Sequence, residues 1–362
     1  MKSRRLIETI ALVGAVSLTV VVGQPALAAD EISDGQWYHQ FLDTTKAHGI
    51  TQGEGITVAI IDTGVDASHP DLAGSVLPGT DLTAAGPGDG RADIHGHGTG
   101  MASLIAGHGR VKGIAPAAKI LPVRAGVILE ARSDKITEGI TWAVDQGAKV
   151  ISISLGSAVD DPEQHDAVKA ALAADVVVVA AIGNMPEVSS PAYPAAYPGV
   201  VAVSAIGRSG EHADNSMIGS QIVIAAPGDV STAYRNGRYN VAQGTSNATA
   251  ITAGAVALIR ARYPQLKAPE VVRRLTATAT DKGAPGRDQE YGFGVLNLVA
   301  ALTADLPADP GSTPSTPDRP IFPLWILLIA GGLLAIAAVT AVVIIAVVIS
   351  SRSRSRRQSG PV

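Results

Sequence analysis

The 362-residue chain contains no cysteine, which excludes disulfide bonds, a thiolate nucleophile and any zinc site built on cysteine. Aromatic residues make up only 4% of the sequence, whereas aliphatic residues, alanine and glycine are frequent. The formal net charge is −4, and basic residues cluster only at the two ends of the chain. Without a basic stripe through the middle, nucleic acid is a poor candidate partner. The remaining composition is typical of a tightly packed parallel sheet flanked by helices.

The first residues of the chain have the order of a secretory signal peptide. A basic start is followed by an apolar stretch and then by small residues, namely Lys2, Arg4, Arg5, Ile10–Val22 and Ala26–Ala28. That order predicts export and cleavage after Ala28 or Ala29, so we assign residues 1–29 to a signal peptide and residues 30–52 to an N-terminal extension of the mature chain. An uncleaved anchor helix is the alternative, but the apolar core is short for a membrane span.

A second apolar segment lies near the C-terminus. The run from Pro323 to Ser350 contains no charged residue, and a helix of this length can cross a bilayer. Four arginines follow it, namely Arg352, Arg354, Arg356 and Arg357. Because short basic flanks stay in the cytoplasm, we predict a transmembrane helix over residues 321–350 and a cytoplasmic basic tail over 351–362. Residues 304–320 are rich in proline, serine and threonine and are predicted to form an extended linker.

Between these ends, short apolar runs alternate with helical patterns. The runs predicted as strands are Thr57–Ile61, Lys119–Val123, Val150–Ser154, Val176–Ala180, Val200–Ala205 and Ile222–Ala225. The segments predicted as helices are Ser133–Gln146, Pro162–Ala174 and Ser246–Tyr263. Strands that alternate with helices imply right-handed crossovers. We therefore expect an α/β fold over residues 53–303, with a mainly parallel β-sheet and helices on both faces.

Three polar residues stand where such a sheet binds ligands, beyond the carboxyl ends of its strands. Asp62 ends the run Val58–Ile61, His97 precedes a small-residue segment that turns helical, and Ser246 follows Gly244-Thr245 at the start of a helix. Taken singly, each has an ordinary alternative, which is a turn aspartate, a surface histidine or an N-cap serine. Together they supply a nucleophile, a base and a carboxylate that orients the base. Their order along the chain is that of the triad in subtilisin.

The segments around these residues resemble the signature blocks of the subtilisin-like serine peptidases. The blocks are Val58–Val65, His97–Gly107, Val178–Asn184 and Gly244–Gly254, within a resemblance that spans Gly53 to Leu302. The resemblance implies a subtilisin-like fold and a serine endopeptidase that acts on proteins or peptides, with Asp62, His97 and Ser246 as its catalytic triad. It also implies that Asn184 contributes to the oxyanion hole. The same resemblance implies a substrate-binding strand made of Ser154, Leu155 and Gly156.

The outer segments are similar to one branch of this family, the mycosins, which are membrane-anchored proteases of type VII secretion. Gln36-Trp37-Tyr38 and Gly53–Val58 carry this resemblance, together with the layout of signal peptide, catalytic domain, proline-rich linker, single membrane helix and basic tail. It implies a single-pass protein of the cell membrane with an extracellular catalytic domain and a type VII secretion complex as partner. No His-Glu-x-x-His or comparable cluster occurs, so we predict no metal and no other cofactor.

The sequence also allows a second candidate for the catalytic base and two functions other than peptidase activity. His95 lies two residues before His97, but only His97 is followed directly by Gly-Thr, so we assign the base to His97. A catalytically silent scaffold subunit of a secretion machine would keep the fold without the activity. An adhesion or ligand-binding ectodomain on a stalk would not need the four blocks. A fluorophosphonate separates these classes, because only an activated serine reacts with it.

Overall fold

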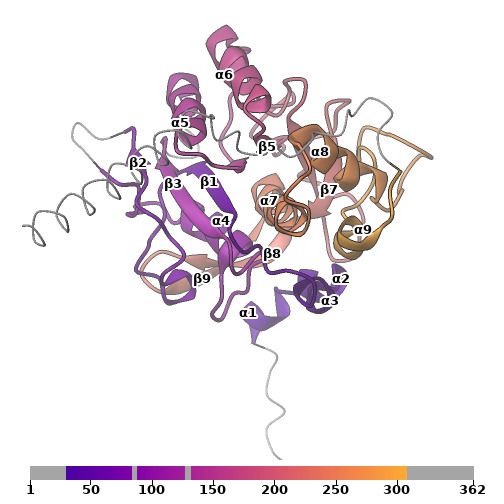
Figure 1. The fold of residues 1–362 in the computed structure, drawn as a ribbon, viewed down its shortest axis with the longest axis horizontal. Coiled ribbons are helices and arrows are strands. Elements are labelled where there is room, and N and C mark those ends of the chain that lie inside the picture. Colours follow the sequence, from indigo (N-terminus) through magenta and orange to yellow (C-terminus); the bar gives the residue numbers. More distant parts are fainter. Residues whose placement is uncertain (1–29, 84–87, 127–131, 308–362) are drawn as a thin grey trace, which may run out of the picture. The chain divides into compact units, whose positions relative to one another are not determined.

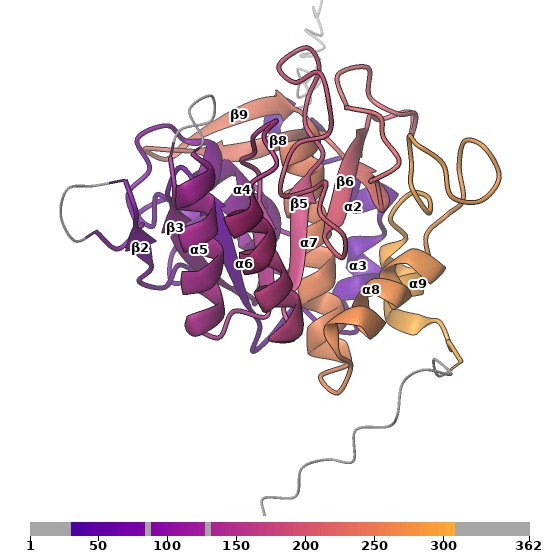
Figure 2. The ribbon, with the colours of Figure 1, turned by 90° about the horizontal axis from the view of Figure 1, so that it is seen from above.

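The computed structural model describes residues 30–83, 88–126 and 132–307 (Figure 1, Figure 2). Up to Leu306 they belong to one structural unit, and a second unit begins at Pro307, its only described residue. The predicted signal peptide, membrane helix and basic tail lie outside the described residues, as does most of the predicted linker. None of the helices that are described combines the length and the hydropathy needed to span a bilayer.

A parallel sheet of seven strands forms the centre of the described structure. Its spatial order is β2 (Thr80–Asp81), β3 (Lys119–Arg124), β1 (Thr57–Asp62), β4 (Val150–Ile153), β5 (Val177–Ala181), β6 (Val201–Ile206) and β7 (Ile224–Pro227). Every neighbouring pair is parallel, which confirms the predicted sheet, and the six predicted strands are present with ends shifted by one or two residues. From β1 the chain reaches the edge strand β2, returns through β3 beside β1, and then crosses to β4 on the other side. The carboxyl ends of the central strands therefore border the crevice where such folds bind ligands.

Two separate apolar cores lie on the two faces of this sheet. Alternate residues of β1 point to opposite faces, so Val58 and Ile60 belong to one core while Ala59 and Ile61 belong to the other. The helices α4 (His97–Ala106) and α7 (Thr245–Arg262) contribute to the first core. The helices α5 (Ser133–Asp145) and α6 (Pro162–Ala173) cover the second face, where Figure 2 places them side by side.

The start of α6 follows local capping chemistry. Asp161 caps α6 by accepting hydrogen bonds from the N–H groups of Glu163 (2.9 Å) and Gln164 (3.4 Å), and Pro162 occupies the first helical position. The observed bounds of α5, α6 and α7 agree with the predicted helices to within one residue at each end. Small residues dominate α7 and nearly all of it is buried, which lets it pass through the molecule beneath the sheet.

Several elements were not predicted from the sequence. They are α1 (Glu31–Asp34), α2 (Tyr38–Phe41), α3 (Thr44–His48), η1 (Pro70–Leu72), the edge strand β2, α8 (Ala268–Ala277), α9 (Leu298–Thr303) and the antiparallel hairpin of β8 (Asp229–Tyr234) and β9 (Arg238–Gln243). The hairpin leads directly into α7. The N-terminal helices attach to it, because the indole of Trp37 donates a hydrogen bond to the carbonyl of Asp229 over 2.6 Å.

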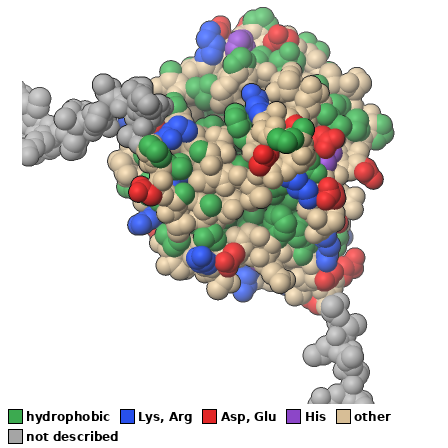
Figure 3. Space-filling model, turned by 90° about the vertical axis from the view of Figure 1, so that its right-hand side faces the viewer, with side chains coloured by type: hydrophobic (Ala, Val, Ile, Leu, Met, Phe, Trp, Pro, Cys, Tyr) green, Lys and Arg blue, Asp and Glu red, His purple; other side chains and the backbone are tan. Residues whose placement is uncertain are grey.

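The surface carries scattered apolar and charged side chains. Large apolar side chains that are exposed among the described residues include Phe41, Ile94, Val159 and Phe293. Figure 3 shows basic and acidic side chains mixed on the face that it presents. Isolated exposed apolar residues are common on folded proteins, so these alone do not define a binding site.

Candidate active site

Asp62 and His97 meet at the carboxyl end of β1. Asp62 is the last residue of the strand and its side chain is fully buried, while His97 is the first residue of α4 and its side chain is 16% exposed. The Nδ1 of His97 lies 2.7 Å from Oδ1 of Asp62. This close approach requires a glycine at position 98, because a Cβ there would lie 2.0 Å from the carbonyl oxygen of Gly64.

The electrostatic surroundings favour a protonated His97. Burial by itself lowers the pKa of this imidazole, but the adjacent Asp62 carboxylate outweighs burial, and Asp93 adds to its effect, so the pKa of His97 is raised. The Oδ2 of Asp62 is buried and has no hydrogen-bond partner among the described residues, so part of its negative charge is not shared with other donors. In the neutral imidazole, Nδ1–H donates to Asp62 and Nε2 keeps the lone pair that can accept a proton.

Ser246 lies in the first turn of α7, where backbone N–H groups have no partner within the helix. The preceding Gly244 has φ +147°, a conformation that L side chains rarely adopt, and a Cβ there would lie 3.1 Å from Oδ1 of Asn184. Helices α4 and α7 pack against each other. Among the described residues the Ser246 hydroxyl makes no hydrogen bond to His97, and such bonds are often loose before substrate binds.

The amide of Asn184 has a defined orientation beside Ser246. Its Oδ1 accepts hydrogen bonds from the backbone N–H of Thr245 (2.8 Å) and from the Thr245 hydroxyl (3.0 Å). A backbone N–H can only donate, so the oxygen of the amide must face Thr245 and the Nδ2 group is left to donate elsewhere. Asn184 and Ser246 both line the same cavity.

The segment Ser154–Gly156 continues β4 toward the same cavity. The Ser154 hydroxyl lies 3.3 Å from the backbone carbonyl of Ser246 and donates to it. Within the described part of the chain, the backbone groups of Leu155 and Gly156 make no backbone hydrogen bonds, whereas the next residue, Ser157, exchanges two with Tyr193. The segment therefore presents free peptide groups to whatever occupies the cavity.

A cavity of about 610 Å³ brings most of these residues together. It is lined by His95, Ser154, Leu155, Gly156, Ser157, Ala158, Ala181, Gly183, Asn184, Glu187, Val188, Ser189, Ala192, Thr245 and Ser246. His95 borders the cavity, but the Asp62 carboxylate binds the ring of His97. The loop after Asn184 was not assigned a role from the sequence, because its residues line the cavity only after the chain turns back toward β4.

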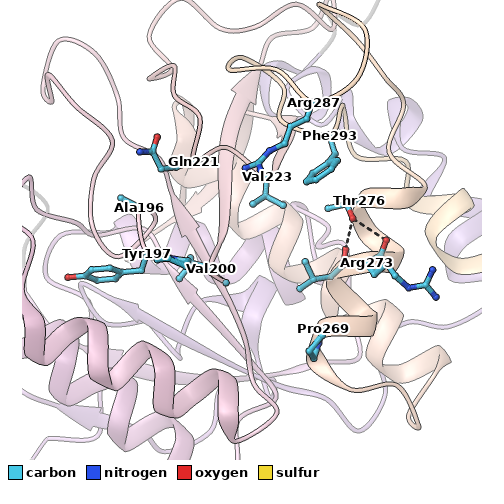
Figure 4. A pocket seen from close by; sticks show the side chains of 13 residues that line it. Ala196, Tyr197, Val200, Gln221, Val223, Pro269, Arg273, Thr276, Arg287 and Phe293 are labelled. Atoms are coloured by element: carbon cyan, nitrogen blue, oxygen red, sulfur yellow. Dashed lines mark hydrogen bonds between the residues drawn. The ribbon is translucent and has the colours of Figure 1, made fainter. Parts of the chain in front are cut away.

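A second cavity, of about 570 Å³, lies between α8 and the segment before β6 (Figure 4). Arg287 stands at its edge, donates to the carbonyls of Ser220 (2.9 Å) and Ile222 (3.2 Å), and stacks 5.1 Å above the ring of Phe293. The described residues that line this cavity include no serine, histidine or carboxylate, so a serine nucleophile with a histidine base cannot form there. No group of three or more potential metal ligands occurs in the described ranges.

The sequence and the fold are both similar to those of known serine proteases. Residues 53–294 match the subtilase family. Thermitase from Thermoactinomyces vulgaris is 38% identical over 276 residues, which cover 75% of this chain and 96% of the relative. A solved structure of the serine protease MycP1, described as an essential component of the type VII (ESX-1) secretion system, is 33% identical with a TM-score of 0.67 and covers 76% of this chain and 90% of that chain. The MycP3 protease of the type VII (ESX-3) system is 31% identical with a TM-score of 0.65, over 74% and 88% of the two chains.

Proposed function

Because the chain belongs to the subtilase family and is a serine-type endopeptidase, we propose that Asp62, His97 and Ser246 are its catalytic triad. The observation that carries this proposal is the 2.7 Å hydrogen bond between Asp62 and His97, formed where β1 ends and α4 begins. Ser246 stands at the start of α7, on the wall of a cavity wide enough for a peptide side chain.

The proposed mechanism uses only groups of this chain. Oγ of Ser246 attacks the carbonyl carbon of the scissile peptide while Nε2 of His97 takes the hydroxyl proton. His97 then gives that proton to the leaving amine, and an acyl-enzyme remains on Ser246. Water, deprotonated by the same Nε2, hydrolyses the ester and releases the acid. Asp62 keeps the imidazole in the tautomer that has a free Nε2 and stabilises the imidazolium that forms in each half-reaction.

Charge on the reacting carbonyl oxygen requires donors that are already oriented. The Nδ2 group of Asn184 is oriented by the contacts of Oδ1 with Thr245, and the N–H of Ser246 belongs to the unpaired first turn of α7. We assign these two donors to the oxyanion hole, where the positive end of the helix adds to their effect. The free peptide groups of Leu155 and Gly156 would pair with the substrate backbone as an added strand.

We also propose a location and a partner. We propose that the protein is anchored in the cell membrane, with the peptidase domain outside and exported proteins as substrates. Three features support this: the signal-peptide pattern, the uncharged run before the C-terminal arginines, and the linker that joins the peptidase domain to that run. The likeness to MycP1 and MycP3, both described as proteases of type VII secretion systems, supports association with such a complex.

Labelling of the full-length protein with a fluorescent fluorophosphonate tests the proposed activity. We expect the wild type to label and to hydrolyse a peptide library, and we expect Ser246→Ala to do neither while unfolding at the same temperature. Ser154→Ala is a matched control, because it removes a neighbouring hydroxyl of the same cavity and should still label. A wild-type protein that folds but does not label would instead support the silent scaffold.

A further inference from the structure

A second buried carboxylate, that of Asp93, lies behind the pair formed by Asp62 and His97. Asp93 is 8% exposed and belongs to the loop that precedes α4. Its Oδ1 accepts hydrogen bonds from the hydroxyl of Thr63 (2.9 Å) and from the backbone N–H groups of His95 (2.9 Å) and Gly96 (2.7 Å). A buried carboxylate is costly unless several donors satisfy it, so this arrangement constrains the loop strongly.

The other oxygen of Asp93 binds the first turn of α4. Its Oδ2 accepts from the backbone N–H of Thr99 (2.9 Å) and from the Thr99 hydroxyl (2.7 Å). These contacts lie on both sides of His97, since Gly96 precedes it and Thr99 follows two residues later. One carboxylate therefore holds the backbone on either side of the imidazole.

Thr63 extends this network to the residue that follows Asp62. The Thr63 hydroxyl donates to Asp93 and also accepts a hydrogen bond from the backbone N–H of Gly98 over 3.0 Å. The end of β1 and the start of α4 are thus joined by Asp93 and Thr63 independently of the hydrogen bond between Asp62 and His97. Relative movement of the strand and the helix would break both connections at once.

Asp93 also offsets an electrostatic disadvantage of the position of His97. An imidazole at the N-terminus of a helix faces the positive end of the helix dipole, which disfavours the imidazolium. A negative charge bound to the same N-terminal N–H groups counteracts that effect. The charged groups that act on His97 are Asp62 at the end of β1 and Asp93 in the loop, and both raise its pKa against the lowering caused by burial.

We propose that Asp93 is a positioning residue of the peptidase reaction, which holds His97 against Asp62 and balances the helix dipole when His97 takes up the proton of Ser246. This inference rests on the proposed function of the triad. It assigns no direct contact with substrate to Asp93, because its carboxylate is taken up by five donors and is not part of the cavity lining.

The test compares full-length wild type with Asp93→Asn on one peptide substrate, across the pH range in which histidine titrates. An asparagine cannot accept from the Thr99 donors with its NH₂ group and carries no charge. We expect kcat to fall by about ten- to a hundredfold with little change in KM, because a displaced base costs rate rather than binding. The low-pH limb of the plot of kcat/KM against pH, called the acidic limb below, should move to lower pH. The reason is that removing the negative charge of Asp93 lowers the pKa of His97.

Asp71→Asn is the matched control. Asp71 is also buried, and its carboxylate accepts from the N–H groups of Arg110 (3.1 Å) and Val111 (2.7 Å) and from the hydroxyl of Tyr239 (3.0 Å), at the opposite end of α4 from His97. We expect this variant to lose stability but to keep the acidic limb of the wild type. If Asp93→Asn keeps both the kcat and the acidic limb of the wild type, or changes only stability as Asp71→Asn does, the proposal is wrong.

Thr63 provides a second pair of variants if Asp93→Asn does not fold. Thr63→Val removes the hydroxyl at nearly constant volume and should lower kcat, whereas Thr63→Ser keeps the hydroxyl and should retain most of it. Equal activity of the two Thr63 variants would contradict the proposal. Failure of the wild type to react with a fluorophosphonate would overturn the proposed triad instead, so the two failures are distinguishable.

Discussion

The side-chain oxygen of Asn184 accepts both the backbone N–H and the hydroxyl hydrogen bond of Thr245, the residue immediately before Ser246. This contact joins the loop after β5 to the first turn of α7. It turns the NH₂ group of Asn184 away from Thr245, and it does so before any substrate is bound. A donor whose orientation is already set needs no reorganisation when charge develops on the substrate oxygen.

We predict that Asn184→Ala lowers kcat by about two to three orders of magnitude, the effect of removing the corresponding donor in subtilisin. KM should change little, because the lost interaction forms mainly in the transition state. Steady-state hydrolysis of one peptide measures both constants. Asn240→Ala, at an exposed position of β9, is the control and should behave as wild type. Equal turnover of Asn184→Ala and wild type would remove Asn184 from the oxyanion hole.

The two neighbouring histidines should respond very differently to substitution. His97→Ala removes the ring bound to Asp62 and should reduce kcat by more than about four orders of magnitude. His95→Ala removes a side chain at the rim of the cavity and should keep kcat within about tenfold, with any loss in KM. Turnover of a single peptide by both variants decides the matter, and the reverse ranking would assign the base to His95.

The strands and helices that were predicted correctly are those marked by local sequence patterns. The apolar runs before Asp62 and Asn184 and the small-residue helix after Ser246 are continuous segments, so their type can be identified without knowing their neighbours. The central sheet followed from the alternation of strands and helices, and the structure confirms it. The family resemblance supplied the roles of the individual residues, which no single segment could.

The elements that were missed depend on contacts between distant segments. β9 is largely exposed and short, with only Tyr239 and Val241 as large apolar side chains. Its clearest local signal is the turn at Asn236-Gly237, where the two residues have left-handed φ values of 62° and 68°. The donors of Asp93 come from the end of β1, its own loop and α4. The sequence around an aspartate in a polar stretch does not indicate how many N–H groups will donate to its carboxylate in the folded protein.

The proposed membrane topology predicts different fates for the two ends of the chain. On intact cells without a wall, external protease should remove an epitope placed near Asp30 and should spare one fused after Val362. The physical reason is that the arginines after the apolar run remain in the cytoplasm while the exported portion lies outside. Permeabilised cells serve as the control, because both epitopes should then be cleaved. Protection of the first epitope on intact cells would contradict the extracellular location.

The last prediction concerns the attachment of the N-terminal helices. His39 lies within α2, with Nδ1 2.9 Å from the Thr44 hydroxyl and Nε2 3.0 Å from the carbonyl oxygen of Lys112. Burial lowers the pKa of His39 from 6.5 to about 4; the hydrogen bond to Lys112 raises it in part, and the charges of His48 and Lys112 lower it further.

Between about pH 4 and 6.5, the unfolded chain therefore binds a proton at His39 that the folded chain does not. Stability must fall as the pH falls through this window, by at most about 3 kcal/mol from this residue. Denaturant unfolding at several pH values measures the slope. His39→Gln should reduce the slope, because an uncharged amide replaces the imidazole. Gln40→Ala, at the neighbouring exposed position of α2, removes no titratable group and should leave the slope unchanged. An identical slope in His39→Gln and wild type would show that this histidine is not what couples the N-terminal helices to pH.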